Sequence, residues 1–373
     1  MHKQRILVVG QTPPPYGGQA IMIQRLLEGT YSSVELVHVR LQFSKGLNTT
    51  GKVQLRKILH LIKVILEIYW NRVLKRPKVF LYHPGGPSRV SMIKDLFILI
   101  TCRWLFDKTV LYFHAAGISE LYGGLSRFTK PLFRLAFFRA DYSIKVLESS
   151  YPDPENLRSK MIRHFPIGVP DYSNNIHLKA DDRSGIHCPK ILFLGAIYES
   201  KGIFDLIDAC ARLAGERAEF SLELVGEFES EGLRENISRI IETSGLSDKI
   251  NVHGVLVGQD KTSMFATSDI FCLPTFFHAE NSPQVIVEAM CFGLPVVATN
   301  WRGIPSIVED GRSGFLVPIR NSQLLSEKLG LLLRDKALRK EMGKYGRDSY
   351  LKTFSLAQFY KNHEMFFEEI TSD

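Results

Sequence analysis

The feature that most constrains the fold is an alternation of short β-like runs with helical patterns, which occurs twice along the chain. In the first half, helical patterns, one of them over Ala20–Leu27, separate five apolar runs: RILVVG, VELVHV, KVFLYH, TVLYFH and ADYSIKV. From Ile191 the alternation restarts, and helices over Ile203–Leu213 and Glu231–Thr243 lie among the runs ILFLG, FSLELVG, KINVHG, DIFCLP and PVVAT. Strands that alternate with helices are typical of a parallel sheet covered by helices on both faces. The sequence therefore predicts two successive α/β domains.

The length of the chain supports the same division. At 373 residues it is long for one hydrophobic core. Residues 171–189 are polar and show no clear period, which predicts a linker. We expect an N-terminal Rossmann-like domain over residues 1–170, a C-terminal one over residues 190–353, and a final helix over residues 354–373.

Charge is distributed unevenly between the two halves. Residues 1–170 contain 25 Lys and Arg against 10 Asp and Glu, whereas residues 171–373 contain 22 against 29. A basic first half indicates contact with something anionic, such as nucleic acid, a membrane surface or a charged acceptor. Neither a zinc-finger spacing nor an RNP-like aromatic motif occurs, so we expect no nucleic acid partner.

Cysteine usage and the N-terminus favour a cytoplasmic protein. The five cysteines are scattered and form no Cys-x-x-Cys pair, which favours reduced thiols over disulfides or a zinc site. MHKQR leads directly into ILVVG, which is too short for the apolar part of a signal peptide. No charge-free apolar run has the length of a membrane-spanning helix.

Two basic segments of the first half leave a membrane question open. Helical patterns over Lys52–Arg76 and Gly124–Val146 mix Lys and Arg with aliphatic and aromatic residues. Such helices can lie in a membrane interface, which would place the protein peripherally on the inner face of the membrane. They can equally be core-facing helices of a doubly wound sheet with a solvated basic edge. The sequence alone does not decide between these interpretations.

The segment FHAENSPQVIVEAMCFGLPVVATN places two carboxylates, Glu280 and Glu288, on either side of a predicted helix start. Ser282 is a suitable N-cap, and Pro283 suits the first helical position. Glu280 would then lie in the preceding loop and Glu288 in the second turn. The helix start between them is an expected seat for a phosphate. A sugar-binding carboxylate, an anion seat and a ribose-binding carboxylate together indicate a nucleotide-sugar pocket.

A structural interpretation of the same carboxylates is available. A Glu before a helix often only stabilises the helix dipole, and a Glu within a helix often faces solvent. Glu288, however, has apolar neighbours nearly all round its helix, so that helix should be buried. A buried carboxylate needs a partner, which favours the functional interpretation.

Further candidate residues follow or end four of the predicted strands. Lys201 precedes a predicted helix start after ILFLG, where its ammonium would face a diphosphate, although a lone loop lysine is usually only solvated. Gly17 and Gly18 follow RILVVG and permit close approach of a ligand to the backbone, a common feature of α/β folds. His114 ends TVLYFH and can face a cleft or be an ordinary structural histidine, and His83 after KVFLY is a weaker candidate.

The residues from Phe277 to Asn300 resemble the Glu-x7-Glu signature of the retaining GT-B glycosyltransferases of family 4, the group 1 type. The segments ILFLGAIYESKGIFDLIDA and GIPSIVEDGRSGFLVP resemble that family as well. The resemblance implies an α/β fold of two Rossmann-like doubly wound domains facing across a cleft. It also implies that the final helix packs back on the N-terminal domain.

The resemblance assigns roles to the candidate residues. It implies catalytic roles for Glu280, Lys201 and His114. Donor binding is implied for five positions: Glu288, Gly17, Gly18, Asn281 and Ser282. Three positions depart from the family pattern: Ala196 stands where many members have Arg, Ile167 where they have Asn, and Arg302 where they often have Gly.

The function implied is transfer of a sugar from a nucleotide-sugar donor, with retention, to a hydroxyl of a glycan or lipid-linked saccharide. No Asp-x-Asp motif or His/Cys cluster occurs, so we expect no metal and no cofactor. A UDP-sugar is the favoured donor, with a GDP-sugar as the alternative. The rival hypothesis is a catalytically silent GT-B subunit that binds nucleotide or scaffolds a partner. A dehydrogenase is disfavoured because no Gly-x-Gly-x-x-Gly follows the first strand.

Overall fold

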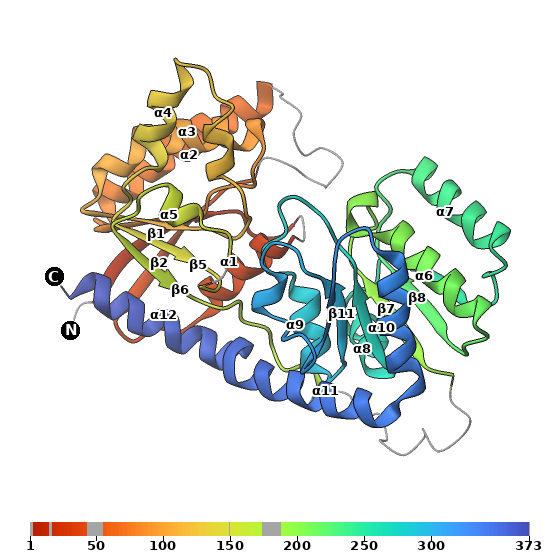
Figure 1. Ribbon diagram of the computed structural model, residues 1–373. Coiled ribbons are helices and arrows are strands. Elements are labelled where there is room, and N and C mark those ends of the chain that lie inside the picture. Colours follow the sequence, from red (N-terminus) through yellow and green to blue (C-terminus); the bar gives the residue numbers. More distant parts are fainter. Residues whose placement is uncertain (1–2, 15–16, 43–54, 149, 174–187, 373) are drawn as a thin grey trace. The chain divides into compact units, whose positions relative to one another are not determined.

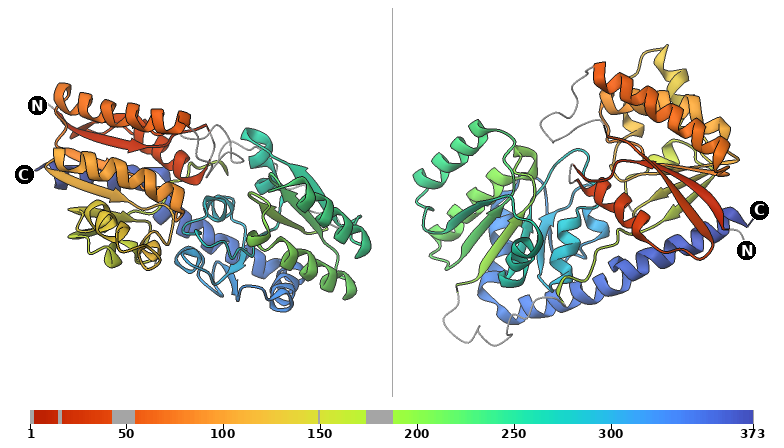
Figure 2. Two further views of the ribbon diagram at one scale, coloured as in Figure 1. Left: turned by 90° about the horizontal axis from the view of Figure 1, so that it is seen from above. Right: turned by 180° about the vertical axis from the view of Figure 1, so that it is seen from behind.

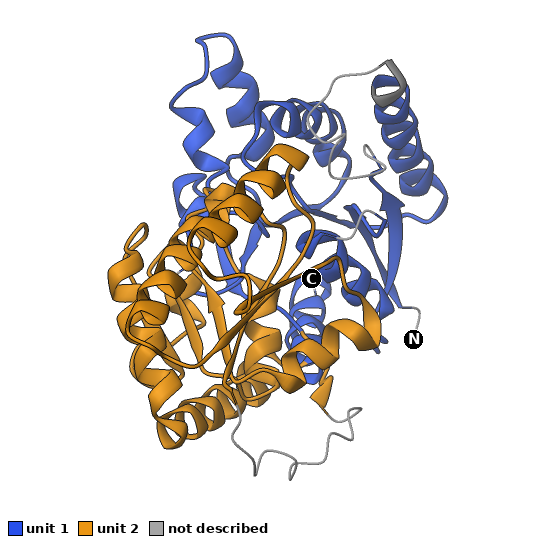
Figure 3. Ribbon diagram, turned by 90° about the vertical axis from the view of Figure 1, so that its right-hand side faces the viewer, with its two compact units in different colours: residues 1–168, 356–373 blue, residues 169–355 orange. Residues whose placement is uncertain are grey.

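The computed structural model describes residues 3–14, 17–42, 55–148, 150–173 and 188–372. The chain forms two compact units (Figure 3). Unit 1 contains residues 1–168 together with 356–373, and unit 2 contains residues 169–355. Each unit is built on one six-stranded sheet in which every described strand pair is parallel.

The sheet of unit 1 has the strand order β2-β1-β3-β4-β5-β6. Its strands are β1 (Gln4–Gly10), β2 (Val34–Arg40), β3 (Val79–Tyr82), β4 (Lys108–Tyr112), β5 (Tyr142–Lys145) and β6 (Met161–His164). The chain adds β2 on one side of β1 and then continues from β3 on the other side. The carboxyl ends of β1 and β3 therefore flank the switch point of this sheet, where open parallel sheets bind ligands.

Helices cover both faces of this sheet (Figures 1 and 2). Leu7 and Val9 of β1 pack in the core that contains α2 (Leu55–Leu74), α3 (Arg89–Cys102) and α4 (Thr129–Phe137). The alternate residues Ile6 and Val8 pack in the core that contains α1 (Gly18–Glu28) and α12 (Leu356–Thr371). This alternation is the period-two pattern of a strand buried on both faces.

The final helix, α12, belongs to unit 1. Four of its apolar side chains are buried in the same core as β1 and α1: Phe359, Phe366, Phe367 and Ile370. Its first residue is Leu356, because the preceding residues Tyr350–Phe354 form a π-helical turn at the end of unit 2. Both ends of the sequence therefore contribute to unit 1.

The sheet of unit 2 has the strand order β12-β11-β10-β7-β8-β9. Its strands are β7 (Lys190–Leu194), β8 (Ser221–Val225), β9 (Ile250–Gly254), β10 (Ile270–Leu273), β11 (Val296–Thr299) and β12 (Gly314–Val317). Six α-helices accompany them in the described part of unit 2: α6 (Ile203–Gly215), α7 (Glu231–Thr243), α8 (Gly258–Thr267), α9 (Gln284–Cys291), α10 (Ser322–Arg334) and α11 (Lys336–Ser349). The switch point of this sheet lies between β7 and β10.

One predicted helix is wrong over most of its length. Within Gly124–Val146 only α4 is an α-helix, and β5 begins shortly after it at Tyr142. The end of α4 has a structural cause, because the buried guanidinium of Arg103 donates to the carbonyls of Leu135, Ala136 and Phe138. These bonds satisfy the last carbonyl groups of the helix. Of Lys52–Arg76, residues 52–54 lie outside the described residues, and α2 covers most of the rest.

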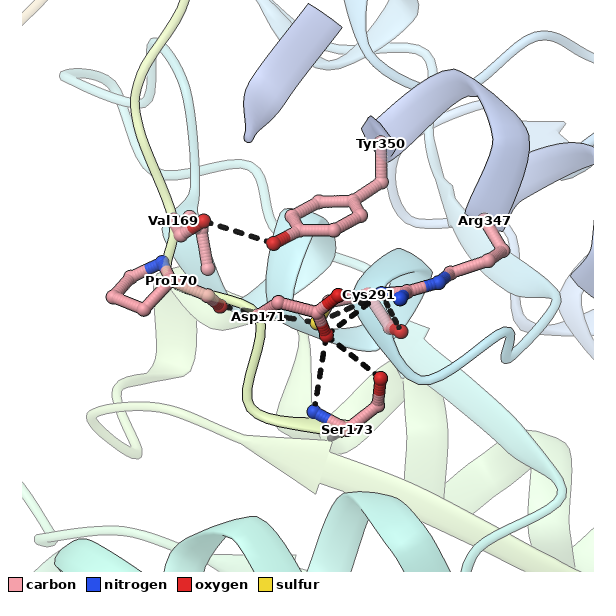
Figure 4. Close-up of polar contacts among 7 residues, drawn as sticks. All are labelled: Val169, Pro170, Asp171, Ser173, Cys291, Arg347 and Tyr350. Atoms are coloured by element: carbon pink, nitrogen blue, oxygen red, sulfur yellow. Dashed lines mark hydrogen bonds and ion pairs between the residues drawn. The ribbon is translucent and has the colours of Figure 1, made fainter. Parts of the chain in front are cut away.

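The first residues of the predicted linker are attached to unit 2 (Figure 4). Arg347 of α11 forms a bidentate ion pair with Asp171 and also donates a hydrogen bond to the carbonyl of Cys291 at 2.7 Å. The hydroxyl of Tyr350 donates to the carbonyl of Val169 at 2.9 Å. Residues 174–187 of that linker lie outside the described residues.

Within the part of the chain that the structure describes, no helix is both long enough and apolar enough to cross a membrane.

Candidate functional site

Two residues predicted as catalytic, Lys201 and Glu280, form an ion pair in unit 2. Lys201 follows β7 and Glu280 follows β10, and these two strands are parallel neighbours. The pair therefore lies at the carboxyl edge of the sheet, beside the switch point. Glu280 is 8% exposed, and its Oε2 also accepts from the hydroxyl of Thr275 at 3.1 Å.

Backbone contacts bring the two loops of this pair together. Phe276 donates its N–H to the carbonyl of Ser200 at 2.7 Å. Gly202, next to Lys201, has a φ of 74°, and a Cβ there would lie 2.0 Å from the carbonyl oxygen of Pro274. Only glycine fits this close approach. The Lys-Gly sequence thus allows the β7 loop to lie directly against the β10 loop.

An aromatic ring also contacts the lysine. The Nζ atom of Lys201 lies 5.0 Å from the centroid of the Phe277 ring, a cation–π distance. Trp301, after β11, donates its Nε1–H to the Phe277 carbonyl at 2.8 Å and so links a third loop to the site. Lys201 has three donor hydrogens, so its pairing with Glu280 leaves capacity for an anionic ligand.

The second carboxylate, Glu288, has its own lysine partner. Glu288 is 3% exposed within α9, and the Nζ of Lys261 in α8 lies 2.8 Å from Oε1 and 2.7 Å from Oε2. The sequence prediction that a buried Glu288 must have a partner is confirmed. Its identity was missed, because Lys261 lies in a short helix whose sequence carries no motif.

The predicted start of α9 needs a correction. The helix begins at Gln284, and Pro283, with a ψ of 111°, occupies the N-cap position instead of the first helical position. Ser282 is therefore not the N-cap. Its hydroxyl oxygen is buried and has no hydrogen-bond partner among the residues that the structure describes.

Asn281 is buried at the same junction. A Cβ on Gly303 would lie 1.8 Å from the Asn281 carbonyl oxygen, so the loop after β11 packs directly on this residue. Next to it, Arg302 has a φ of 50° and places its guanidinium 5.4 Å from the Trp301 ring centroid. The loops after β10 and β11 thus form one packed unit around Glu280.

A second cation that sequence reasoning missed is Arg320, which follows β12. Its guanidinium lies 4.8 Å from the centroid of the Phe276 ring, and Phe276 is hydrogen-bonded to Ser200. Ala196 supplies no positive charge after β7, and Arg320 approaches the same pair of loops from another strand. A signal for this arrangement is absent from the sequence, because it depends on the sheet order.

The predicted site residue His114 lies in unit 1, and its ring is hydrogen-bonded to the ring of His83. His83 Nδ1 and His114 Nε2 are 2.9 Å apart, at the ends of the neighbouring strands β3 and β4. Both rings stack near Tyr112, with centroid distances of 5.2 and 4.4 Å. Burial lowers the pKa of His114 to about 3 and that of His83 well below its usual value, so both imidazoles are neutral at pH 7.

Gly17 and Gly18 lie where β1 leads into α1. Helix α1 begins at Gly18, and Gly17 is its N-cap with an extended backbone. A Cβ on Gly17 would meet no atom within 4 Å among the described residues, so no contact of unit 1 requires glycine there. In the described residues, no cluster of three or more His, Cys, Asp or Glu side chains is arranged to hold a metal ion.

Comparisons with known proteins bear on the family of unit 2 and on the fold of the chain. Residues 183–349, which lie within unit 2, match the family described as glycosyl transferases group 1. The D-inositol 3-phosphate glycosyltransferase of Paenarthrobacter aurescens is 32% identical over 155 residues, which cover 41% of this chain and 38% of that protein. The phosphatidyl-myo-inositol mannosyltransferase of Mycobacterium leprae is 33% identical over 150 residues, 40% and 38% of the two chains. The matches thus span less than half the length of these curated relatives.

Solved structures match over nearly the whole chain. A sucrose-phosphate synthase from Thermosynechococcus elongatus has a TM-score of 0.72 at 18% identity and covers 99% of this chain and 100% of its own. The Anabaena protein HepE in complex with UDP-glucose has a TM-score of 0.70 at 17% identity and covers 99% of both chains. At this level of identity the likeness establishes the fold. The chain therefore has the GT-B fold, and its residues 183–349 match the group 1 glycosyl transferase family.

Proposed function

We propose that this protein is a retaining, metal-independent glycosyltransferase that uses a nucleotide-sugar donor. The acceptor that we propose is a hydroxyl of a glycan or of a lipid-linked saccharide. The observation that carries the proposal is the pairing of Lys201 with Glu280 at the switch point of unit 2, directly before α9. Glu288 lies buried in the same helix.

Each residue of unit 2 has a role that follows from its chemistry. The diphosphate of the donor is bound by the ammonium of Lys201 and the amino end of α9, where positive charge accumulates. Glu280 accepts hydrogen bonds from hydroxyls of the donor sugar, and Asn281 and Ser282 line the same junction. Glu288, held by Lys261, accepts from the ribose hydroxyls.

The residues of unit 1 act as uncharged groups. His114 is an uncharged imidazole after β4 and can exchange hydrogen bonds with the transferred sugar. Gly17 and Gly18 allow the backbone at the start of α1 to approach the diphosphate. These assignments predict that unit 1 orients the reactants and that unit 2 stabilises the developing charge.

The chemical step that we propose is a front-face displacement. The bond between the anomeric carbon and the diphosphate oxygen breaks, and its electron pair leaves with the nucleoside diphosphate. The acceptor oxygen forms its bond on the same face of the sugar, and its proton passes to the departing phosphate oxygen. Lys201 stabilises the negative charge that develops on that oxygen, so its largest contribution is to the transition state.

The donor base is a separate part of the proposal. HepE was solved with UDP-glucose, and it shares this fold, so a UDP-sugar is our first choice and a GDP-sugar the second. Calorimetric titration with UDP, GDP, ADP and their common sugar conjugates tests this choice, with Glu288→Ala as the matched variant. We expect one nucleotide to bind tightly to the parent protein and to bind more weakly to the Glu288→Ala variant.

The same titration can reject the proposal. If no nucleotide binds, the chain is better explained as a catalytically silent subunit with this fold. If a nucleotide binds equally to the parent and to Glu288→Ala, the ribose role of Glu288 is wrong. NMR of the product formed from an identified donor distinguishes retention from inversion at the anomeric carbon.

A further inference from the structure

We propose that the outer face of α2, α3 and α4 in unit 1 is a docking surface for an anionic lipid bilayer. In unit 1 these three helices form the layer on one side of the sheet (Figure 1). Their inner sides are buried in the core, and their outer sides carry large apolar side chains exposed to solvent. We call this outer side the helical face. The proposal concerns association and does not depend on the chemistry proposed for unit 2.

The longest part of the helical face is on α2. Val64 and Ile68 of this helix are buried against the sheet, whereas Trp70 is 66% exposed. The exposed apolar residues recur every three or four positions and so form one continuous stripe: Leu59, Ile62, Leu66, Tyr69 and Val73. An amphipathic helix of a globular protein normally shows polar residues at such positions, so α2 has a second apolar side without a partner among the described residues.

The stripe continues onto α3 and the turn after it. Val90, Ile93 and Phe97 are exposed at helical spacing, and Trp104, in the 3-10 turn Arg103–Leu105, is 62% exposed. The hydroxyl of Tyr69 donates to the carbonyl of Thr101 at 3.0 Å, which joins the α2 stripe to the α3 stripe. The two stripes are therefore parts of one surface.

Helix α4 adds a third apolar stripe. Phe128 is 74% exposed, and Leu132 and Leu135 follow it at helical spacing. Large contiguous apolar surfaces are uncommon on soluble proteins and indicate a binding surface. Tryptophan and tyrosine on such a surface are typical of the membrane interface, where their rings are partly apolar and partly hydrated.

Charge identifies the occupant as an anionic membrane. Unit 1 has 26 Lys and Arg against 14 Asp and Glu, whereas unit 2 has 21 against 25. On the helical face, the exposed Arg127 places its guanidinium 4.8 Å from the ring centroid of Phe128, and the exposed Arg134 of α4 places its own 5.8 Å from that of Phe138. Two copies of this face would bring like charges together, whereas anionic headgroups would be attracted by them.

A basic cavity of about 900 Å³ adjoins the helical face and shares Trp104 and Leu135 with it. Arg134, Arg139 and Arg158 contribute to its lining, and its acidic members are Asp107 and Asp141, the second of which pairs with Lys160 at 2.7 Å. No ion pair of Arg139 or Arg158 with a described residue is present. This cavity is the place where we expect the phosphates of lipid headgroups to gather.

Vesicle binding by the full chain tests the proposal. The probes are vesicles of phosphatidylcholine alone and vesicles that also contain phosphatidylglycerol, compared by flotation at several salt concentrations. Two double variants are compared with the parent: Trp70→Ser/Phe97→Ser on the helical face and Arg139→Gln/Arg158→Gln in the cavity. The matched control in unit 2 is Val255→Ser/Val257→Ser, since both valines are exposed.

We expect the parent and the unit 2 control to float with the anionic vesicles and not with the neutral ones. The helical-face variant should lose at least tenfold in partition coefficient. A basic residue near an anionic surface contributes about fivefold to the partition coefficient, so the cavity variant, which lacks two, should lose about twenty-five-fold and show a weaker salt dependence. Circular dichroism should show that all variants are folded, because every substituted side chain is exposed.

Three results would overturn the proposal. One is equal flotation of the parent with neutral and anionic vesicles, and another is an equal loss in the unit 2 control and the helical-face variant. The third is a dimer in sedimentation that Trp70→Ser/Phe97→Ser abolishes while vesicle binding is absent, which would assign the surface to a second copy of this chain.

Discussion

The two units have sheets of the same size and the same kind of switch point, yet the side chains at the carboxyl edges of their sheets differ in charge. In unit 2 this edge holds two buried carboxylates, Glu280 and Glu288, each against a lysine. In unit 1 it holds the uncharged imidazoles of His83 and His114. The topology fixes where a ligand can bind, and the loop residues decide what that place can do.

The largest effect that tests this contrast is expected from the ion pair of unit 2. Lys201→Ala should lower turnover by about 10²–10³-fold, the range for loss of one group that stabilises transition-state charge. Glu280→Ala should also lower turnover, and the double variant should lose much less than the product of the two single losses because the side chains form one unit. Release of nucleoside diphosphate from the bound donor, with water as acceptor, is the measurement.

Lys340→Ala is the matched control, since that lysine is exposed in the same unit and should be neutral. The contrast between the units would fail if His114→Asn lowered turnover more than Lys201→Ala. In that case the chemistry would depend on the neutral edge rather than on the charged one.

The second test concerns the stability of the Glu288–Lys261 pair. Lys261→Met leaves a buried carboxylate without its cation, and we expect a loss of about 3 kcal/mol in the free energy of unfolding of unit 2. Lys261→Met/Glu288→Gln should recover most of that loss because no charge is then buried. Urea unfolding followed by Trp301 fluorescence, with Trp70 and Trp104 replaced by Phe, reports on unit 2 alone.

If Lys261→Met unfolds at the same urea concentration as the parent, the pair is not a stabilising contact. Nucleotide titration of the same variant then gives a separate answer on ribose binding. A variant that keeps its stability but loses nucleotide affinity would show that Lys261 only positions Glu288 for the ligand.

The third test separates the units by pH. Burial lowers the pKa values of three histidines in unit 1. It lowers the pKa of His114 to about 3, that of His363 in α12 to about 4, and that of His83 well below its usual value. The unfolded chain protonates these rings below about pH 6.5, while the folded unit keeps them neutral, so acid favours unfolding. Each ring then lowers the free energy of unfolding of unit 1 by up to about 1.4 kcal/mol per pH unit. Unit 1 should therefore lose stability from about pH 6.5 towards pH 4.

Unit 2 should respond to acid at a lower pH. Arg347 and Ser173 donate hydrogen bonds that outweigh partial burial and hold the pKa of Asp171 at about 2. The stability from this ion pair is present above the unfolded pKa near 3.8 and is lost as the pH falls towards 2. Hydrogen exchange read peptide by peptide should show unit 1 losing protection first. Simultaneous loss in both units above pH 5 would contradict this assignment.

The sequence predicted the parts of the fold and site that depend on local pattern. The alternation of strands and helices predicted both sheets and five of the six strands in each, but not β6 or β12. The apolar surroundings of Glu288 predicted a buried carboxylate with a partner. Lys261 and Arg320 could not be predicted, because each meets its neighbours through the packing of separate elements of the fold rather than through sequence spacing. The start of α9 was misplaced by one residue for a local reason, since the backbone of Pro283 is extended, with a ψ of 111°, and Pro283 therefore occupies the N-cap position instead of the first helical position.

The exposed side of α2 shows a different limit. The predicted helix is confirmed as α2, but periodicity says only that a helix has an apolar stripe and not which stripe meets the core. In the structure Val64 and Ile68 are buried, while Leu66 and Trp70 are exposed on the opposite side. A helix with two apolar sides looks the same in sequence as one buried on both.

The smallest predicted effect is at the start of unit 2. Tyr350→Phe removes the hydroxyl that donates to the Val169 carbonyl at 2.9 Å, and Tyr350 is fully buried, so the carbonyl would lose this bond without gaining water. We expect a loss of about 1 kcal/mol in the free energy of unfolding of unit 2 and none in unit 1. Tyr345→Phe, whose exposed hydroxyl donates to Glu309, is the matched control and should change stability by less than about 0.5 kcal/mol. Equal effects of the two substitutions on the free energy of unfolding would mean that the Val169 contact does not stabilise unit 2. A loss of hydrogen-exchange protection in the peptides of unit 1 would mean that the two sheets do not unfold separately.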